Sequence, residues 1–327
     1  MKSADHQPKY DYCPDLWIIV SYFNPLNYRT RRFNYETFIN AIDRSRLNHL
    51  TIECAFDGQG FSLPDNSSVV KVRSRSVLWQ KERLLNLAIS WLPRSCKYVA
   101  WLDCDLLFTN SRWATETVRL LQQYPVVQLF ERCIRLPQGE TCYRGEGNIT
   151  ASFASITSRD SSTLHSGRFD DHGHTGYGWA ARREVLDHCG LYEYAIAGSA
   201  DHYIAHAIFG DFDGICLRRM MYDNQKLRHH FRDWAVKFHA EAGNRIAAVP
   251  GDVLHLWHGE MQNRQYLLRH RELASHNFNP FTDIKSLPGR PLEWNTDNQA
   301  LKDWFSSYFA SRCEDGDNSK TTEEKAA

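Results

Sequence analysis

The chain has 327 residues, and its 39 basic and 39 acidic side chains cancel, with a pI near 7.2. Because there is no basic excess, the charge pattern gives no support for nucleic-acid binding. No apolar run approaches the roughly 18 residues that a membrane span needs. Hydrophobic residues make up 42% of the chain, enough for a substantial core, and the length predicts one large domain or two small ones.

The cysteines also bear on the class of protein. All nine are scattered along the chain and form no Cys-x-x-Cys pair, which argues against a disulfide framework or a zinc ribbon and for reduced thiols. The first residues, MKSADHQPKYDY, contain no apolar signal core. A cytoplasmic protein is therefore expected.

The first 130 residues alternate between strand-like and helix-like patterns. Continuous apolar runs such as LWIIVSY are typical of buried strands in parallel sheets. The expected strands cover 16–22, 50–56, 68–73, 98–102 and 126–130, and the expected helices cover 34–45, 78–92 and 114–123. This alternation predicts an α/β fold with a mostly parallel, Rossmann-like central sheet and helices on both faces.

The second half of the chain begins with a change of pattern. Residues 131–174 are rich in small and polar residues and lack periodicity, which predicts a long, mobile substrate loop. Further helices are expected over 179–189, 201–209, 224–242, 263–270 and 301–309, and a strand over 252–257. We expect a single domain divided into a flexible N-terminus (1–15), two functional halves (16–130 and 131–270), a helical extension (271–311) and a disordered tail (312–327).

The segment 98–109, YVAWLDCDLLFT, places two aspartates at the end of a buried strand. On an extended chain Asp103 and Asp105 point to the same side, and two like charges there are costly unless a cation neutralises them. Oxygen ligands suit Mg²⁺ or Mn²⁺. The alternative is a strand-end turn with two solvated aspartates. Cys104, between them, is expected to point into the core.

A second motif, HTGYGWAARR, covers 174–183 and combines glycines with aromatic residues. Gly178 permits close backbone approach, and Tyr177 and Trp179 could pack against the C–H faces of a sugar ring. A buried tryptophan explains Trp179 equally well.

A third motif, Gly-Ser-Ala-Asp-His, covers 198–202 and leads into a helix. Asp201 could act as a general base or bind an acceptor hydroxyl. On local sequence alone, a helix-capping carboxylate explains it better.

A fourth motif, HLWHG, covers 255–259. On a strand, residues three apart lie on opposite faces, so His255 and His258 are not expected to bind one ion together. His258, at the strand end, is the better candidate metal ligand. Arg264 is well suited to bind a diphosphate.

In this order, the four motifs resemble those of glycosyltransferases with the GT-A fold, nearest to the β-1,4-galactosyltransferase and polypeptide N-acetylgalactosaminyltransferase types. The resemblance covers roughly residues 16–266. It implies a UDP-sugar donor held through Mn²⁺ or Mg²⁺ by the Asp-x-Asp pair Asp103 and Asp105, with His258 as the late metal ligand. It also implies a glycan or other hydroxyl acceptor, with Asp201 as the base.

The resemblance assigns further residues to the two halves, 16–130 for the nucleotide-sugar and 131–270 for the acceptor and catalysis. The implied donor contacts are Ser21, Phe23, Asn24, Arg83, Asn86, Asp103 and Arg264. The implied sugar or acceptor contacts are Tyr177, Gly178, Trp179 and His202. One departure is that Ser199 and Ala200 stand where the family prefers Gly and Glu.

The sequence thus favours a metal-dependent, inverting sugar transfer. A retaining transferase and a catalytically silent sugar- or nucleotide-binding module stay open as alternatives. A sugar nucleotidyltransferase is less favoured, because no Gly-rich basic loop follows the first strand.

Overall fold

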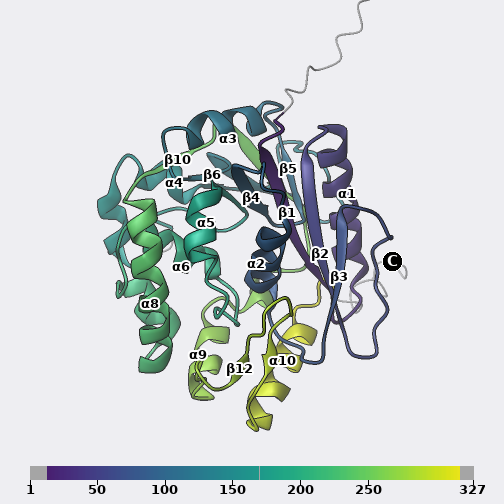
Figure 1. Cartoon of the computed structure of the whole chain (residues 1–327), viewed down its shortest axis with the longest axis vertical. Helices are drawn as coiled ribbons and strands as arrows, with labels where there is room; N and C mark the ends of the chain where they lie inside the picture. Colours follow the sequence, from purple (N-terminus) through teal and green to yellow (C-terminus); the bar gives the residue numbers. More distant parts are fainter. Residues whose placement is uncertain (1–12, 169, 317–327) are drawn as a thin grey trace, which may run out of the picture.

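The computed structural model describes residues 13–168 and 170–316 (Figure 1). Its centre is a seven-stranded sheet with the order β10-β6-β9-β4-β1-β2-β3. The strands are β1 (Leu16–Phe23), β2 (Asn48–Phe56), β3 (Val69–Ser74), β4 (Tyr98–Leu102), β6 (Val126–Gln128), β9 (Gly178–Arg182) and β10 (Ile246–Ala248). All neighbours are parallel except β9, which is antiparallel to both β4 and β6. The predicted α/β class with a mostly parallel central sheet is confirmed.

A second, four-stranded sheet lies beside the first and has the order β5-β11-β7-β8. Its strands are β5 (Leu106–Phe108), β7 (Arg132–Arg135), β8 (Asn148–Ala151) and β11 (Asp252–His255). The chain passes from β4 in the first sheet to β5 in the second across only three residues, 103–105. The two expected metal-binding aspartates therefore lie where the two sheets meet.

Helices cover both faces of the central sheet and bury a separate core on each (Figure 1). One core contains residues of α1 (Arg29–Arg44) and α3 (Trp113–Leu121). The other contains residues of α2 (Lys81–Trp91), α5 (Arg183–Cys189), α6 (Ala200–Ile208) and α8 (Gln225–Ala242). The helical apolar patterns of α1 and α2 correspond to the residues that these helices bury, such as Phe38 and Ile42 of α1 and Leu84, Leu85 and Ala88 of α2.

The remaining elements complete the second half of the chain and its C-terminal part. They are α4 (Phe153–Thr157), η1 (Ser161–Ser166), α7 (Ile215–Met221), η2 (Met261–Arg264), α9 (Leu268–Ser275), β12 (Ile284–Lys285), β13 (Glu293–Trp294) and α10 (Gln299–Ser311). In Figure 1, α9 and α10 lie at the lower end of the molecule, beyond the carboxyl ends of the parallel strands.

Two expectations for the second half are wrong. The segment 131–174 is not a structureless loop, because it contains β7, β8, α4 and η1. The expected helix over 179–189 is a strand up to Arg182, and helix α5 begins only at Arg183. The short apolar run WAA fits a buried strand as well as a helix, and pairing with β4 and β6 decides for the strand.

The expected disordered tail begins too early. Arg312 and Glu314 are 2% and 1% exposed, so the chain packs against the domain at least as far as these residues. Cys13, within the expected flexible N-terminus, is also buried. Residues 1–12 and 317–327 lie outside the described residues.

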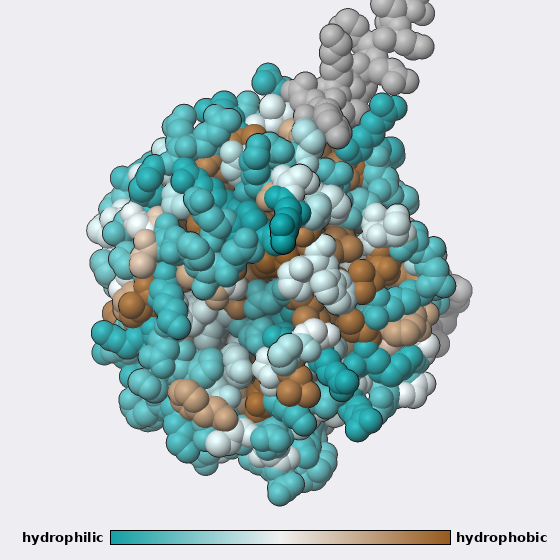
Figure 2. Space-filling view, viewed as in Figure 1, coloured by the Kyte–Doolittle hydropathy of each residue, from teal (hydrophilic) through white to brown (hydrophobic). Residues whose placement is uncertain are grey.

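The surface is mixed in character. On the face shown in Figure 2, hydrophilic residues predominate, and hydrophobic residues gather near its centre, in the region of α2 and β3. None of the helices in the described ranges combines the length and the apolar composition needed to cross a lipid bilayer.

Candidate active site

The segment between β4 and β5 carries Asp103 and Asp105 at the carboxyl edge of the central sheet. The Asp103 N–H donates a hydrogen bond to the Tyr177 carbonyl (2.8 Å), which fixes the end of β4 beside the start of β9. The Leu256 N–H donates to the Asp105 carbonyl (2.8 Å), which joins the segment to the end of β11. Cys104 lies between the aspartates and is buried in the core, as predicted.

Asp105 forms a cluster with the two histidines of the HLWHG motif. Its Oδ2 lies 3.3 Å from Nε2 of His258 and 3.7 Å from Nε2 of His255, and the two Nε2 atoms are 2.9 Å apart. The expectation that these histidines face opposite sides is wrong. Strand β11 ends at His255, so the alternation of a strand does not extend to His258. Antiparallel pairing of β11 with β5, with His255 opposite Leu106, brings His255 next to Asp105.

The donor atoms of this cluster fit a divalent cation. The ligand atoms of Asp105, His255 and His258 lie within 4.8 Å of one another. Asp105 Oδ1 is buried and lacks a hydrogen-bond partner among the described residues, and burial, reinforced by Asp103, raises the Asp105 pKa to about 7. A buried carboxylate of this kind favours a cation nearby. Two imidazoles and one carboxylate suit Mn²⁺ or another first-row metal better than Mg²⁺, and three protein ligands leave positions open for a substrate.

Asp103 contacts a different partner. Lys81 Nζ lies 2.7 Å from Asp103 Oδ1 and 2.9 Å from Asp201 Oδ2, so one buried ammonium bridges both carboxylates. Burial alone would lower the Lys81 pKa, but Asp103 and Asp201 together hold it well above its usual value. Burial raises the pKa of Asp201, although Lys81 opposes this. The structure therefore brings Asp103 and Asp201 together, about 100 residues apart in the chain.

Lys81 was missed in the sequence, where Arg83 and Asn86 of the same helix were assigned to the donor. The Arg83 side chain instead pairs with Glu193 (3.1 Å) and donates to the carbonyl of Arg290 (2.7 Å). The Asn86 amide donates to Glu193 Oε2 (3.0 Å). Both side chains form hydrogen bonds with the loops around 193 and 290. The structure does not bring them to Asp103 and Asp201. Lys81 is only two residues before Arg83, and the sequence carries no signal that distinguishes which of them faces the aspartates.

The tip of β1 is largely closed. Phe23 is 1% exposed and packs edge-on against Trp79 (5.4 Å between ring centroids), so its ring does not face solvent. The Asn24 side chain both donates to the Tyr28 carbonyl and accepts from the Tyr28 N–H, each at 2.9 Å, and thereby orders the entry to α1. Ser21 is 8% exposed. The expected donor contacts of Phe23 and Asn24 are thus occupied by internal packing and hydrogen bonding.

The expected sugar or acceptor contacts do not lie together in one surface. The centroid of the Tyr177 ring lies 4.1 Å from that of His174, on which it stacks, and 4.7 Å from that of His255. Tyr177 therefore packs against the cluster of Asp105, His255 and His258. Trp179 is 0% exposed and its Nε1 donates to the Thr175 carbonyl (2.7 Å), which favours the buried interpretation.

Two other expected sugar or acceptor contacts, Gly178 and His202, are also buried. Gly178 packs closely against Leu102, because a Cβ there would come within 2.6 Å of Leu102 Cδ2 and that side chain would have to shift. His202 is buried and belongs to a different cluster, with His172, His206 and Cys216.

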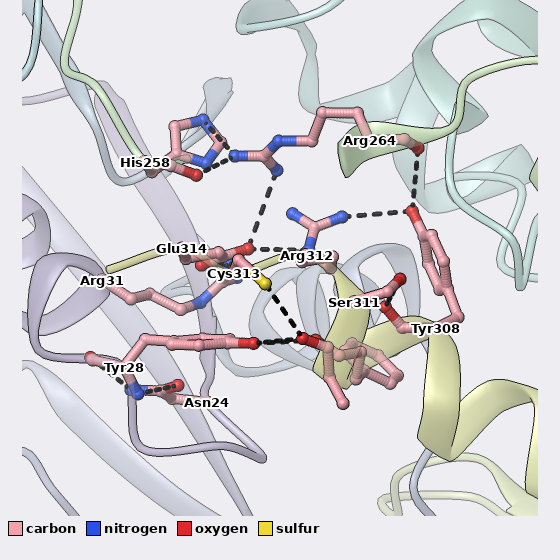
Figure 3. Close-up of polar contacts among 12 residues, drawn as sticks. Asn24, Tyr28, Arg31, His258, Arg264, Tyr308, Ser311, Arg312, Cys313 and Glu314 are labelled. Carbon is pink, nitrogen blue, oxygen red and sulfur yellow. Dashed lines mark hydrogen bonds and ion pairs between the residues drawn. The ribbon is translucent and has the colours of Figure 1, made fainter. Parts of the chain in front are cut away.

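Three arginines gather around Glu314, and one of them, Arg264, lies beside His258 (Figure 3). Arg264 Nη2 donates to the His258 carbonyl (2.6 Å) and lies 3.0 Å from His258 Nε2. Its other nitrogen, Nη1, lies 3.7 Å from Glu314, which also pairs with Arg312 (2.7 Å) and Arg31 (3.3 Å). Burial opposes the charge on Glu314, but the three guanidiniums hold its pKa at about 2. Three cations around one carboxylate leave an excess of positive charge next to Asp105.

Comparisons with known proteins add the following. No family model matches the chain, and no curated protein matches it. Among solved structures, the chain is similar to glucosyl-3-phosphoglycerate synthase from Mycobacterium tuberculosis in complex with Mn²⁺ and uridine-diphosphate-glucose, at 13% identity, over 85% of this chain and 86% of that one, with a TM-score of 0.42.

Two further structures share this level of similarity. The chain is similar to the catalytic domain of Drosophila beta1,4galactosyltransferase 7 in complex with xylobiose, at 13% identity over 89% and 98% of the two chains, with a TM-score of 0.35. It is also similar to 4-diphosphocytidyl-2C-methyl-D-erythritolsynthase from Anaerococcus prevotii, at 8% identity over 72% and 86%, with a TM-score of 0.34. At such scores the similarity says nothing about chemistry, and function has to be argued from the residues of this chain.

Proposed function

We propose that the chain is a metal-dependent glycosyltransferase that moves a sugar from a UDP-sugar to an acceptor hydroxyl with inversion at the anomeric carbon. One observation carries the proposal. A ligand set for a divalent cation (Asp105, His255 and His258) lies at one sheet edge beside an excess of guanidinium charge, and Asp103 and Asp201 are held by Lys81 near the same edge. A diphosphate needs cations, and an acceptor hydroxyl needs a base, and the described residues bring both together.

The donor diphosphate has two sources of positive charge in this arrangement. Arg264 is held against His258, so its guanidinium is positioned next to the metal ligands. A bound Mn²⁺ supplies Lewis-acid stabilisation of the charge that develops on the departing diphosphate. Asp105, His255 and His258 are the residues that would hold it. Asp103, the further ligand expected from the sequence, has one carboxylate oxygen, Oδ1, paired with Lys81.

Asp201 is the proposed base. Its carboxylate takes the proton of the acceptor hydroxyl while the new bond from that oxygen to the anomeric carbon forms and the bond to the diphosphate breaks. The raised pKa of Asp201, caused by burial, makes it a better proton acceptor than a solvated aspartate. Lys81 orients the carboxylate and must give up part of its contact with it for the proton transfer to occur.

One contact favours a second candidate function. Lys81 pairs with both Asp103 and Asp201, so each carboxylate already has an ion-pair partner in the described structure. A module that binds a sugar nucleotide without turnover would tolerate this arrangement, whereas a transferase has to open it.

A panel of UDP-sugars tests the proposal. With Mn²⁺ present, we expect one or more donors to raise the melting temperature and to release UDP, and EDTA should abolish the release until Mn²⁺ is restored. The control is Asp65→Asn, an exposed aspartate paired with Lys71. Stabilisation without UDP release across donors and acceptors would favour the binding module, and activity that survives both chelation and Asp105→Asn would refute metal dependence. The anomeric configuration of the product, read by NMR, separates inversion from retention.

A further inference from the structure

A second cluster of potential metal ligands lies apart from the cluster of Asp105, His255 and His258. It consists of His172, His202, His206 and Cys216, which are between 0% and 4% exposed. The ligand atoms of all four lie within 4.8 Å of one another, and Cys216 Sγ is 3.7 Å from Nε2 of His172. Four buried groups of this kind converging on one point are unusual for a core that could be filled by apolar side chains.

The Nδ1 atoms of the three imidazoles each lie within hydrogen-bond distance of an oxygen atom. Nδ1 of His206 is 2.8 Å from Asp211 Oδ2, and Nδ1 of His172 is 3.0 Å from the Gly173 carbonyl. Nδ1 of His202 is 3.4 Å from Thr175 Oγ1. Histidines that bind metals characteristically donate their second ring N–H to a carboxylate or a carbonyl, which fixes the tautomer and orients the ring.

The inward-facing side of the cluster is what requires an explanation. Nε2 of His206 is fully buried and lacks a hydrogen-bond partner among the described residues, and an unpaired buried polar atom is costly. Burial lowers the pKa of both His172 and His202, because it disfavours the charged imidazolium.

We propose that His172, His202, His206 and Cys216 bind one Zn²⁺ in a closed, four-coordinate site. Three imidazole nitrogens and one thiolate are a donor set that suits zinc, and four protein ligands leave no position for a substrate. In a tetrahedral zinc site the ligand atoms lie roughly 3.3–3.6 Å apart, close to the 3.7 Å between Cys216 and His172. As the Zn–S bond forms, the thiol proton is released to solvent.

The zinc would tie together three segments that support the candidate active site. His172 lies two residues before His174, in the segment that leads to Tyr177, and the Tyr177 ring packs on His255. His202 and His206 are one turn apart on α6, the helix that begins next to Asp201, and Cys216 lies on α7. The site therefore serves to position the start of α6, and it stands whether or not the chain transfers sugars.

Metal analysis tests the proposal on full-length protein purified without a polyhistidine tag. After dialysis against EDTA, we expect about one zinc per chain, and the same content in Asp105→Asn. Cys216→Ser and His206→Ala should each lose the zinc and melt at a lower temperature. The matched control is Cys142→Ser, because Cys142 is an exposed cysteine and should leave zinc unchanged.

A second measurement does not depend on the variants folding. The wild-type protein, stripped under denaturing and reducing conditions and refolded with Co²⁺, should show a thiolate-to-cobalt charge-transfer band and the intense visible bands of tetrahedral cobalt. Asp105→Asn should show the same spectrum. The proposal is overturned if Asp105→Asn contains no zinc, both as purified and after incubation with Zn²⁺, or if the cobalt protein lacks the charge-transfer band.

Discussion

Two clusters of metal-ligating side chains in this molecule differ in the number of ligands and in what surrounds them. Asp105, His255 and His258 offer three ligands and are partly exposed. The Arg264 guanidinium lies beside His258, and Lys81 holds the carboxylates of Asp103 and Asp201 near the same sheet edge. His172, His202, His206 and Cys216 offer four ligands and are fully buried. Three ligands leave room for a reacting group, whereas four complete a tetrahedron. The first arrangement suits catalysis and the second suits structural support.

Asp201 is the residue through which the two clusters meet, because it precedes His202 on α6 and pairs with Lys81 on the side of Asp103. We expect Asp201→Asn to lower kcat by about 10²–10⁴-fold, the usual contribution of a general base. Zinc content and melting temperature should stay near those of the wild type. A variant with a wild-type rate would reassign the base, and one that loses zinc would assign Asp201 to structural support.

Asp105→Asn addresses the three-ligand cluster alone. We expect a loss of about 10²–10³-fold in kcat at saturating Mn²⁺, comparable to the removal of one electrostatic contact to the transition state. The expected zinc content is unchanged. Parallel titrations with Mn²⁺ and Zn²⁺, read by activity and by metal analysis, would show whether the two clusters are independent. A coupled loss of both metals would show that the two clusters are not independent.

Glu314 tests the charge beside the three-ligand cluster. Its pKa is held at about 2 by Arg312, Arg31 and Arg264, below the ordinary 4.5. The ion pairs therefore stabilise the fold above about pH 4.5, and the contribution is lost as the pH falls from there towards 2.

Glu314→Gln should thus lower the free energy of unfolding by about 3–5 kcal/mol at pH 7, since it leaves buried guanidiniums without a counter-charge. The difference from the wild type should shrink below pH 4.5 in urea unfolding. Glu36→Gln, at an exposed ion pair with Arg32, is the control. A difference that is as large at pH 2 as at pH 7 would show that Glu314 acts through packing rather than charge.

The smallest effect is expected at Arg83, which the sequence assigns to the donor and the structure to the loops around 193 and 290. Arg83→Ala should lower the free energy of unfolding by about 1 kcal/mol, the net value of such hydrogen bonds. The donor KM should not change. Arg119→Ala, at an exposed pair with Glu116, is the control. A raised donor KM without a loss of stability would return Arg83 to the donor site.

The sequence by itself determined the parts that depend on local patterns. Apolar runs and amphipathic periodicity identify the parallel strands and their helices up to residue 130, because burial on two faces or on one leaves a direct trace in composition. The same reasoning located Asp103 and Asp105 at a strand end and Asp201 in the first turn of a helix.

Only the tertiary structure decided which of these groups meet. His255 reaches Asp105 through the pairing of β11 with β5, and Lys81 rather than Arg83 faces the carboxylates because of how α2 packs on the sheet. Glu314 contacts Arg31 across 283 residues, and Cys216 contacts His172 across 44. Such contacts depend on how whole elements pack. A pattern read over a short stretch of sequence carries no information about partners so far apart in the chain.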